Sequence, residues 1–110
     1  MIEELRIGPT TYRVIFTGSD QLEHLKRDEE EEAPSGESQP DACRMIVNKD
    51  HHAQQQIIAL FHEIYHLILL QAGKFYESSD EELVSVLAHG IVQVLRDNPQ
   101  FVRVVQEWPA

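Results

Sequence analysis

Apolar and polar residues alternate near the beginning of the chain, between Leu5 and Thr17. Alternation with a period of two is typical of β-strands, because successive side chains of a strand point to opposite faces of a sheet. The turn residues Gly8-Pro9-Thr10 interrupt the alternation, so the pattern predicts a hairpin of two strands. A third strand is predicted at Ala42–Val47, where an apolar run ends at Asn48-Lys49-Asp50.

The segment 18–41, between the second and third strands, has a different composition. Acidic residues follow one another without interruption at Asp28–Glu32, and the residues up to Pro40 are rich in Pro, Ser, Gly and Gln. Such a composition buries too little apolar surface to offset the entropy lost when the backbone is ordered. We therefore predict a flexible acidic loop at 18–41, inserted between strands.

Helical patterns replace strand patterns in the second half of the chain. Asp50 is a good N-cap and Gly73 is a good residue to follow a helix. The apolar residues between them point all round the helix axis, which predicts a buried helix. A second helix is predicted after the sequence Ser79-Asp80-Glu81-Glu82, which has the form of a capping box with Ser79 as the N-cap, and it ends at Asp97-Asn98-Pro99.

A short last helix is predicted from Gln100 to Trp108. We expect one face of it to pack inward, because its apolar residues recur at helical spacing. These residues are Phe101, Val104, Val105 and Trp108. With 110 residues, the chain is long enough for one small domain, 1–110, but not for two. The predicted fold class is α+β, with a three-stranded antiparallel sheet packed on two main helices and a short C-terminal helix.

Composition and charge argue against several functions and locations. A formal net charge of −10 argues against binding the phosphate backbone of a nucleic acid, which requires clustered Lys and Arg. The acidic start Met1-Ile2-Glu3-Glu4 lacks the features of a secretory signal. The longest apolar stretch is interrupted by polar residues and is shorter than the ~20 residues of a membrane span. Cys43, the single cysteine, fits a reducing compartment. We therefore expect a cytoplasmic protein that binds neither nucleic acid nor membrane.

The clearest chemical motif is His62-Glu63-Ile64-Tyr65-His66, inside the apolar helix. Residues four apart lie on the same face of a helix, so both imidazoles can bind one zinc ion while Glu63 acts as general base on a bound water. The alternative is a pair of ordinary core histidines, but burying two His and a Glu without partners costs several kcal/mol. A metal ion removes that cost, and we predict a site for Zn2+.

A catalytic zinc ion takes three protein ligands and leaves one coordination position open. In the metzincin spacing a Gly and a third His follow three and six residues after the second His. This chain has Leu69 and Ala72 at those places, so that class is excluded. The third ligand is therefore expected to be a carboxylate from the next helix.

Several residues are candidates for the third ligand. They are Glu77, Glu81 and Glu82, with His89 as a further imidazole. In the predicted capping box, the side chain of Glu82 reaches back to the backbone of Ser79, whereas Glu81 is free to turn toward the first helix. Glu81 is therefore favoured. Glu82 stays open, since Ser78 could be the N-cap instead and exchange the two roles.

The chain resembles the compact ImmA/IrrE-like zinc metallopeptidase domains, especially the short versions carried by phages and prophages. The resemblance lies in the order of the predicted elements and in two segments, His62–Leu69 and Glu81–Ala88. The resemblance covers most of the chain apart from the acidic loop. It implies a minimal zincin-like fold and a protein or peptide substrate. The site residues that it implies are His62, His66 and Glu81 as zinc ligands and Glu63 as catalytic base. The family pattern Glu-x-x-Ala-Asn-x-Phe-Ala keeps only its first Glu and last Ala here.

Two functions of different kinds fit these observations. The first is hydrolysis of a peptide bond by a zinc-bound water, with Glu63 as general base. The second is a non-catalytic zinc-binding protein whose acidic surface binds a basic protein partner. An open coordination position distinguishes them, because structural zinc is usually enclosed by four protein ligands.

Overall fold

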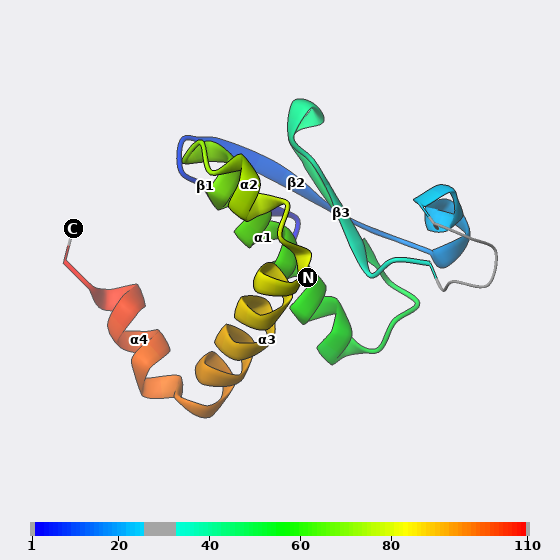
Figure 1. Cartoon of the computed structure of the whole chain (residues 1–110). Helices are drawn as coiled ribbons and strands as arrows, with labels where there is room; N and C mark the ends of the chain where they lie inside the picture. Colours follow the sequence, from blue (N-terminus) through cyan, green and yellow to red (C-terminus); the bar gives the residue numbers. More distant parts are fainter. Residues whose placement is uncertain (1, 26–32, 110) are drawn as a thin grey trace.

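The computed structural model describes residues 2–25 and 33–109, in which a β-sheet precedes a set of helices (Figure 1). The strands are β1 (Glu4–Ile7), β2 (Thr10–Thr17), β3 (Gly36–Gln39) and β4 (Arg44–Asn48). They lie side by side in the order β1-β2-β4-β3. β1 pairs with β2, and β3 with β4, in antiparallel orientation, whereas β2 and β4 run parallel. The predicted hairpin and the α+β class are confirmed.

The prediction of three antiparallel strands is wrong, because the sheet has a fourth strand and one parallel pair. The sequence of β3, Gly36-Glu37-Ser38-Gln39, has no apolar alternation that could have revealed it. As an edge strand it pairs only with β4, through backbone hydrogen bonds that do not depend on apolar side chains. A short 3-10 helix (Pro40–Ala42) and Cys43, with φ of 52°, then reverse the chain. This reversal brings β4 between β2 and β3, where it runs parallel to β2.

The segment predicted as a flexible loop, 18–41, contains regular structure on both sides of its acidic block. A 3-10 helix spans Ser19–Leu25, and β3 occupies the other end of the segment. The buried Leu22 anchors the first part, and backbone pairing with β4 holds the second. The acidic block Asp28–Glu32 lies outside the described residues.

Helix α1 (Ala53–Gln71) carries the His-Glu-x-x-His motif and packs against the sheet. The core between them is formed by Ile7, Tyr12, Val14, Met45, Val47, Leu60 and Leu67. Gly73 follows the helix with φ of 74° and donates its backbone N–H to the carbonyl of Leu70, as predicted for a glycine just beyond a helix. Although α1 is apolar, no helix of the described part of the chain combines the length and the hydropathy that a membrane span requires.

The start of α1 differs from the prediction. His52, not Asp50, is the N-cap, and its ring Nδ1 accepts a hydrogen bond from the backbone N–H of Gln55 at 3.2 Å. The carboxylate of Asp50 instead accepts a hydrogen bond from the backbone N–H of Ser19 at 2.7 Å. Asp50 therefore ties the 3-10 helix that follows β2 to the segment before α1.

Three helices complete the fold: α2 (Phe75–Ser78), α3 (Glu81–Asp97) and α4 (Pro99–Glu107). α3 packs against α1, and its buried residues are Val84, Ala88 and Val92. The predicted capping box is wrong, since Asp80 is the N-cap of α3 and its carboxylate accepts a hydrogen bond from the backbone N–H of Leu83 at 3.1 Å. Ser79 is instead the C-cap of α2, and its hydroxyl donates to the carbonyl of Tyr76.

The last predicted helix forms as α4, but it does not pack inward. It leaves the end of α3 at Asn98-Pro99 and extends away from the other helices (Figure 1). Its apolar residues Phe101, Val104, Val105 and Trp108 are 50, 52, 57 and 72% exposed. Pro99 lies in the first turn of α4, and the side chain of Asn98 donates to the carbonyl of Val94 at 2.8 Å. This elbow directs α4 away from α1, so its apolar face meets no partner in the described structure.

Candidate metal centre

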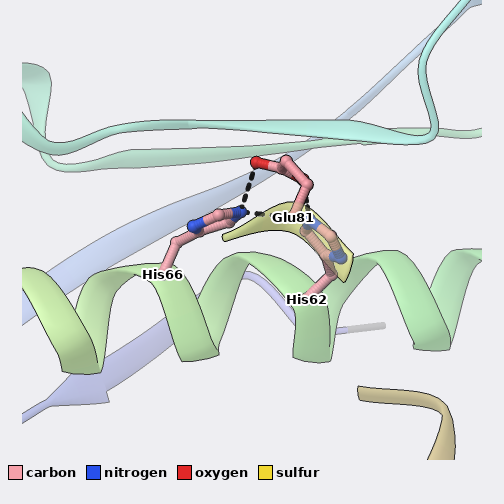
Figure 2. Close-up of side chains that lie close together, drawn as sticks. All are labelled: His62, His66 and Glu81. Atoms are coloured by element: carbon pink, nitrogen blue, oxygen red, sulfur yellow. Dashed lines mark hydrogen bonds and ion pairs between the residues drawn. The ribbon is translucent and has the colours of Figure 1, made fainter. Parts of the chain in front are cut away.

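His62 and His66 lie one turn apart in the middle of α1 (Figure 2). Their rings meet edge to face with centroids 4.8 Å apart, and their Nε2 atoms are 3.0 Å apart. The sequence spacing alone produces this approach, because residues i and i+4 are neighbours on a helix surface. The first half of the predicted site is therefore a local property of α1.

Glu81 brings a carboxylate to the same point from the first turn of α3. Its two oxygens lie 2.9 Å from Nε2 of His62 and 3.0 Å from Nε2 of His66 (Figure 2). Gly73 and α2 reverse the chain, so the N-terminus of α3 returns beside the middle of α1. The ligand atoms of the three side chains all lie within 4.8 Å of one another.

These three side chains suit a zinc ion in chemistry and in spacing. Zinc binds imidazole nitrogen at ~2.0–2.1 Å and carboxylate oxygen at ~2.0–2.2 Å, which puts neighbouring ligands of a tetrahedral site about 3.3 Å apart. The distances found here, 2.9 and 3.0 Å, are only slightly shorter. His62, His66 and Glu81 could therefore hold a metal ion after a small outward adjustment of the side chains.

The hydroxyl groups next to Nδ1 of the two rings are compatible with the same conclusion. Nδ1 of His66 lies 3.2 Å from Oγ of Ser78, and Nδ1 of His62 lies 3.3 Å from Oγ of Ser85. A neutral imidazole carries one N–H, so a ring that donates from Nδ1 to a serine presents a lone pair at Nε2. In that tautomer two lone pairs 3.0 Å apart would face a carboxylate, an arrangement that a positive charge between them would stabilise.

Burial acts against placing that positive charge on His62 itself. Loss of hydration lowers the pKa of His62 below its ordinary value, although the hydrogen bond to Glu81 acts in the opposite direction. The neutral form, which is the form that binds metals, is therefore favoured at neutral pH. A metal ion held by the three ligand atoms could supply that positive charge instead.

Glu63 lies next to this group and is only 7% exposed. Burial raises the pKa of Glu63 to about 7, while hydrogen bonds with the hydroxyl and backbone N–H of Ser38 act in the opposite direction. Ser38 belongs to β3, which approaches α1 closely at Gly36: a Cβ added there would lie 2.8 Å from the carbonyl oxygen of Ile46 and 3.7 Å from Cγ of Glu63. A carboxyl group with a pKa near neutrality can both accept and release a proton under ordinary conditions.

An open groove of about 690 Å³ gives access to these residues. It lies between β3, the middle of α1 and the beginnings of α2 and α3. Its polar lining includes Ser38, His62, Glu63, His66, Glu81 and His89. A groove of this size accommodates a small molecule or a short stretch of extended chain.

The structure brings together the three side chains favoured as ligands, with Glu63 beside them. Of the other candidates within the described ranges, Glu82 and Glu77 lie outside the group, and His89 lines the groove without joining it. α3 begins one residue later than predicted, which makes Glu81 the first residue of the helix. Glu81 nevertheless turns toward the two imidazoles as predicted, although its side chain stays 62% exposed, and Glu82 is exposed as well.

Sequence reasoning missed the serines around the site. Ser85 follows Glu81 by four residues, so helical spacing does place it on the same face of α3, but that spacing does not reveal its contact with His62. Ser38 and Ser78 belong to no motif, and their roles depend on segments that fold back onto α1. A hydroxyl group has no distinctive sequence signal of its own.

Comparisons with protein-family models, with curated proteins and with solved structures find no match for this chain. No relative therefore contributes evidence on the site.

Proposed function

We propose that the protein is a zinc-dependent peptidase of the ImmA/IrrE-like kind, acting on a protein or peptide substrate. The observation that carries the proposal is the approach of Glu81 to His62 and His66, at 2.9 and 3.0 Å, beside a buried carboxyl group in an open groove. Three protein ligands leave a coordination position free, as in catalytic zinc sites, whereas structural sites usually have four. This arrangement favours chemistry over a purely structural role for the metal.

Each residue has its own role in the proposed reaction. His62, His66 and Glu81 would hold a zinc ion, which would act as a Lewis acid that polarises a peptide carbonyl and makes a water molecule more acidic. Glu63 accepts a proton from the attacking water as the new carbon–oxygen bond forms. It then delivers that proton to the peptide nitrogen as the carbon–nitrogen bond breaks, which leaves a carboxylic acid and an amine. At neutral pH the acid passes its remaining proton to the amine.

Ser38 supports Glu63 during both proton transfers. Its hydrogen bonds fix the carboxyl group from the side of β3, opposite the helix that carries it. A base must be held within hydrogen-bond reach of the proton that it moves, so this contact contributes positioning rather than chemistry. The edge strand thus forms one wall of the proposed active site.

Replacement of Glu63 by Gln tests the proposal, because the amide has nearly the same shape but cannot accept the proton. Glu63→Gln should keep the zinc content of the parent protein and lower the turnover number by about 10²–10⁴-fold. Zinc is measured by elemental analysis of the zinc-reconstituted protein, and cleavage with a library of quenched fluorescent peptides. Glu82→Gln, which removes a neighbouring exposed carboxylate, is the control and should change neither quantity. Equal turnover in Glu63→Gln and the parent would exclude Glu63 as the base.

The net charge of −10 supports a second candidate, a non-catalytic zinc-binding protein that captures a basic partner. The same proteins separate the two functions. A zinc-loaded parent that cleaves none of the peptides, yet binds a Lys- and Arg-rich peptide as tightly as Glu63→Gln does, would favour the binding function.

A further inference from the structure

Both histidines of the metal centre have a serine behind them, on the side of the ring away from Glu81. Ser78 contacts His66 at 3.2 Å and Ser85 contacts His62 at 3.3 Å, each through Nδ1 of the ring. Ser78 is the last residue of α2, whereas Ser85 lies one turn after Glu81 on α3. Two separate elements therefore support the two rings of a motif that lies wholly on α1.

The direction of the hydrogen bond is clearest at Ser78, which is only 5% exposed. Its hydroxyl donates to the backbone carbonyl of His66 at 3.3 Å. Since a serine hydroxyl has a single proton, the oxygen is left to accept a hydrogen bond from Nδ1 of the same residue. This arrangement keeps the proton of His66 on Nδ1 and leaves the lone pair of Nε2 facing Glu81.

We propose that Ser78 and Ser85 are positioning residues that fix the tautomer and the orientation of His66 and His62 for metal binding. The inference rests on the zinc site of the proposed function. The inference also assigns a structural role to α2, because this one-turn helix places Ser78 next to Nδ1 of His66. Both partners are uncharged, so they orient the rings without adding a negative charge to a site that already contains Glu81 and Glu63.

The experiment compares the zinc affinity of Ser78→Ala and Ser85→Ala with that of the full-length parent chain. Each substitution removes the acceptor of an Nδ1–H, and we expect zinc to dissociate about 10–100-fold more readily. Affinity is measured at neutral pH by competition with a chromophoric chelator. Ser79→Ala is the matched control: Ser79 lines the same groove, but its hydroxyl donates to the carbonyl of Tyr76, and its zinc affinity should equal that of the parent.

A second measurement separates ring orientation from general damage to the fold. The visible absorption spectrum of the cobalt-substituted protein depends on ligand geometry, so it should change in both alanine variants and stay unchanged in Ser79→Ala. Ser85→Thr keeps the hydroxyl on a half-buried position and should restore the affinity and the spectrum of the parent. If Ser78→Ala does not fold, Ser85→Ala and Ser85→Thr decide the question.

The outcomes distinguish this inference from the proposed function. A parent protein that binds no stoichiometric zinc overturns both. A parent that binds zinc, with alanine variants of equal affinity and identical cobalt spectra, overturns the role of the serines and leaves the zinc site intact.

Discussion

The groove around His66 and the outer face of α4 differ in how their side chains meet their surroundings. In the groove, polar groups are buried and paired: Ser78 and His66 are 5 and 9% exposed and contact each other. On α4 and at its C-cap, the apolar side chains of Phe101, Val104, Val105 and Trp108 are at least half exposed. Burying a polar group is costly unless it is paired, whereas exposed apolar side chains are common on protein surfaces. The paired polar groups therefore mark the candidate functional region, and the apolar periodicity of α4 shows only that the segment is a helix.

Replacement of Glu81 by Gln should have the largest effect on the groove. The substitution keeps the shape of the side chain but removes the negative charge that faces the two imidazoles at 2.9 and 3.0 Å. We expect the zinc affinity to fall by more than the ~10–100-fold that is typical for loss of an outer hydrogen-bond partner. Competition with a chromophoric chelator measures the change.

Glu82→Gln provides the control for this experiment, because it removes the same charge from the adjacent position on α3. Its zinc affinity should equal that of the parent. Loss of zinc from Glu82→Gln, with retention in Glu81→Gln, would show that the start of α3 is arranged differently in solution and that Glu82 is the third ligand.

A smaller effect is expected from Val84→Ala, on the buried side of α3. Val84 is 0% exposed at the contact with α1, so the substitution removes two methyl groups from the core and leaves a cavity. Transfer and cavity contributions together should lower the free energy of unfolding by about 2 kcal/mol. Urea denaturation in the presence of a chelator measures the loss without a contribution from bound metal. An unchanged unfolding midpoint would mean that α3 does not pack on α1 through this face.

The residues of the site differ in how far their positions could be predicted from sequence. His62, Glu63 and His66 belong to one helical segment, so their spacing fixes their relative positions. The position of Glu81 depends on a second helix, α3, that returns beside α1. The capping argument favoured Glu81 as the third ligand, although the predicted N-cap, Ser79, is one residue too early. Long-range contacts of this kind are set by packing and cannot be derived from local periodicity.

The two largest errors in the predicted fold have related physical causes. β3 was not predicted because an edge strand made of Gly36-Glu37-Ser38-Gln39 is held by its backbone and carries no apolar pattern. The prediction that α4 packs inward is wrong because its apolar pattern does not encode the direction of the elbow at Asn98-Pro99. A polar segment can thus be ordered by pairing with a neighbouring strand, whereas an apolar helix face can remain without packing partners.

Val105→Ala, the counterpart of Val84→Ala on α4, should have the smallest effect. The same two methyl groups are removed, but Val105 is 57% exposed, so little buried surface is lost. Alanine also has a higher helix propensity than valine, which offsets part of any lost contact. The free energy of unfolding should therefore stay within about 0.5 kcal/mol of the parent value in the same urea experiment. A loss as large as that of Val84→Ala would mean that the outer face of α4 is covered in solution, and the contrast between the two regions would then disappear.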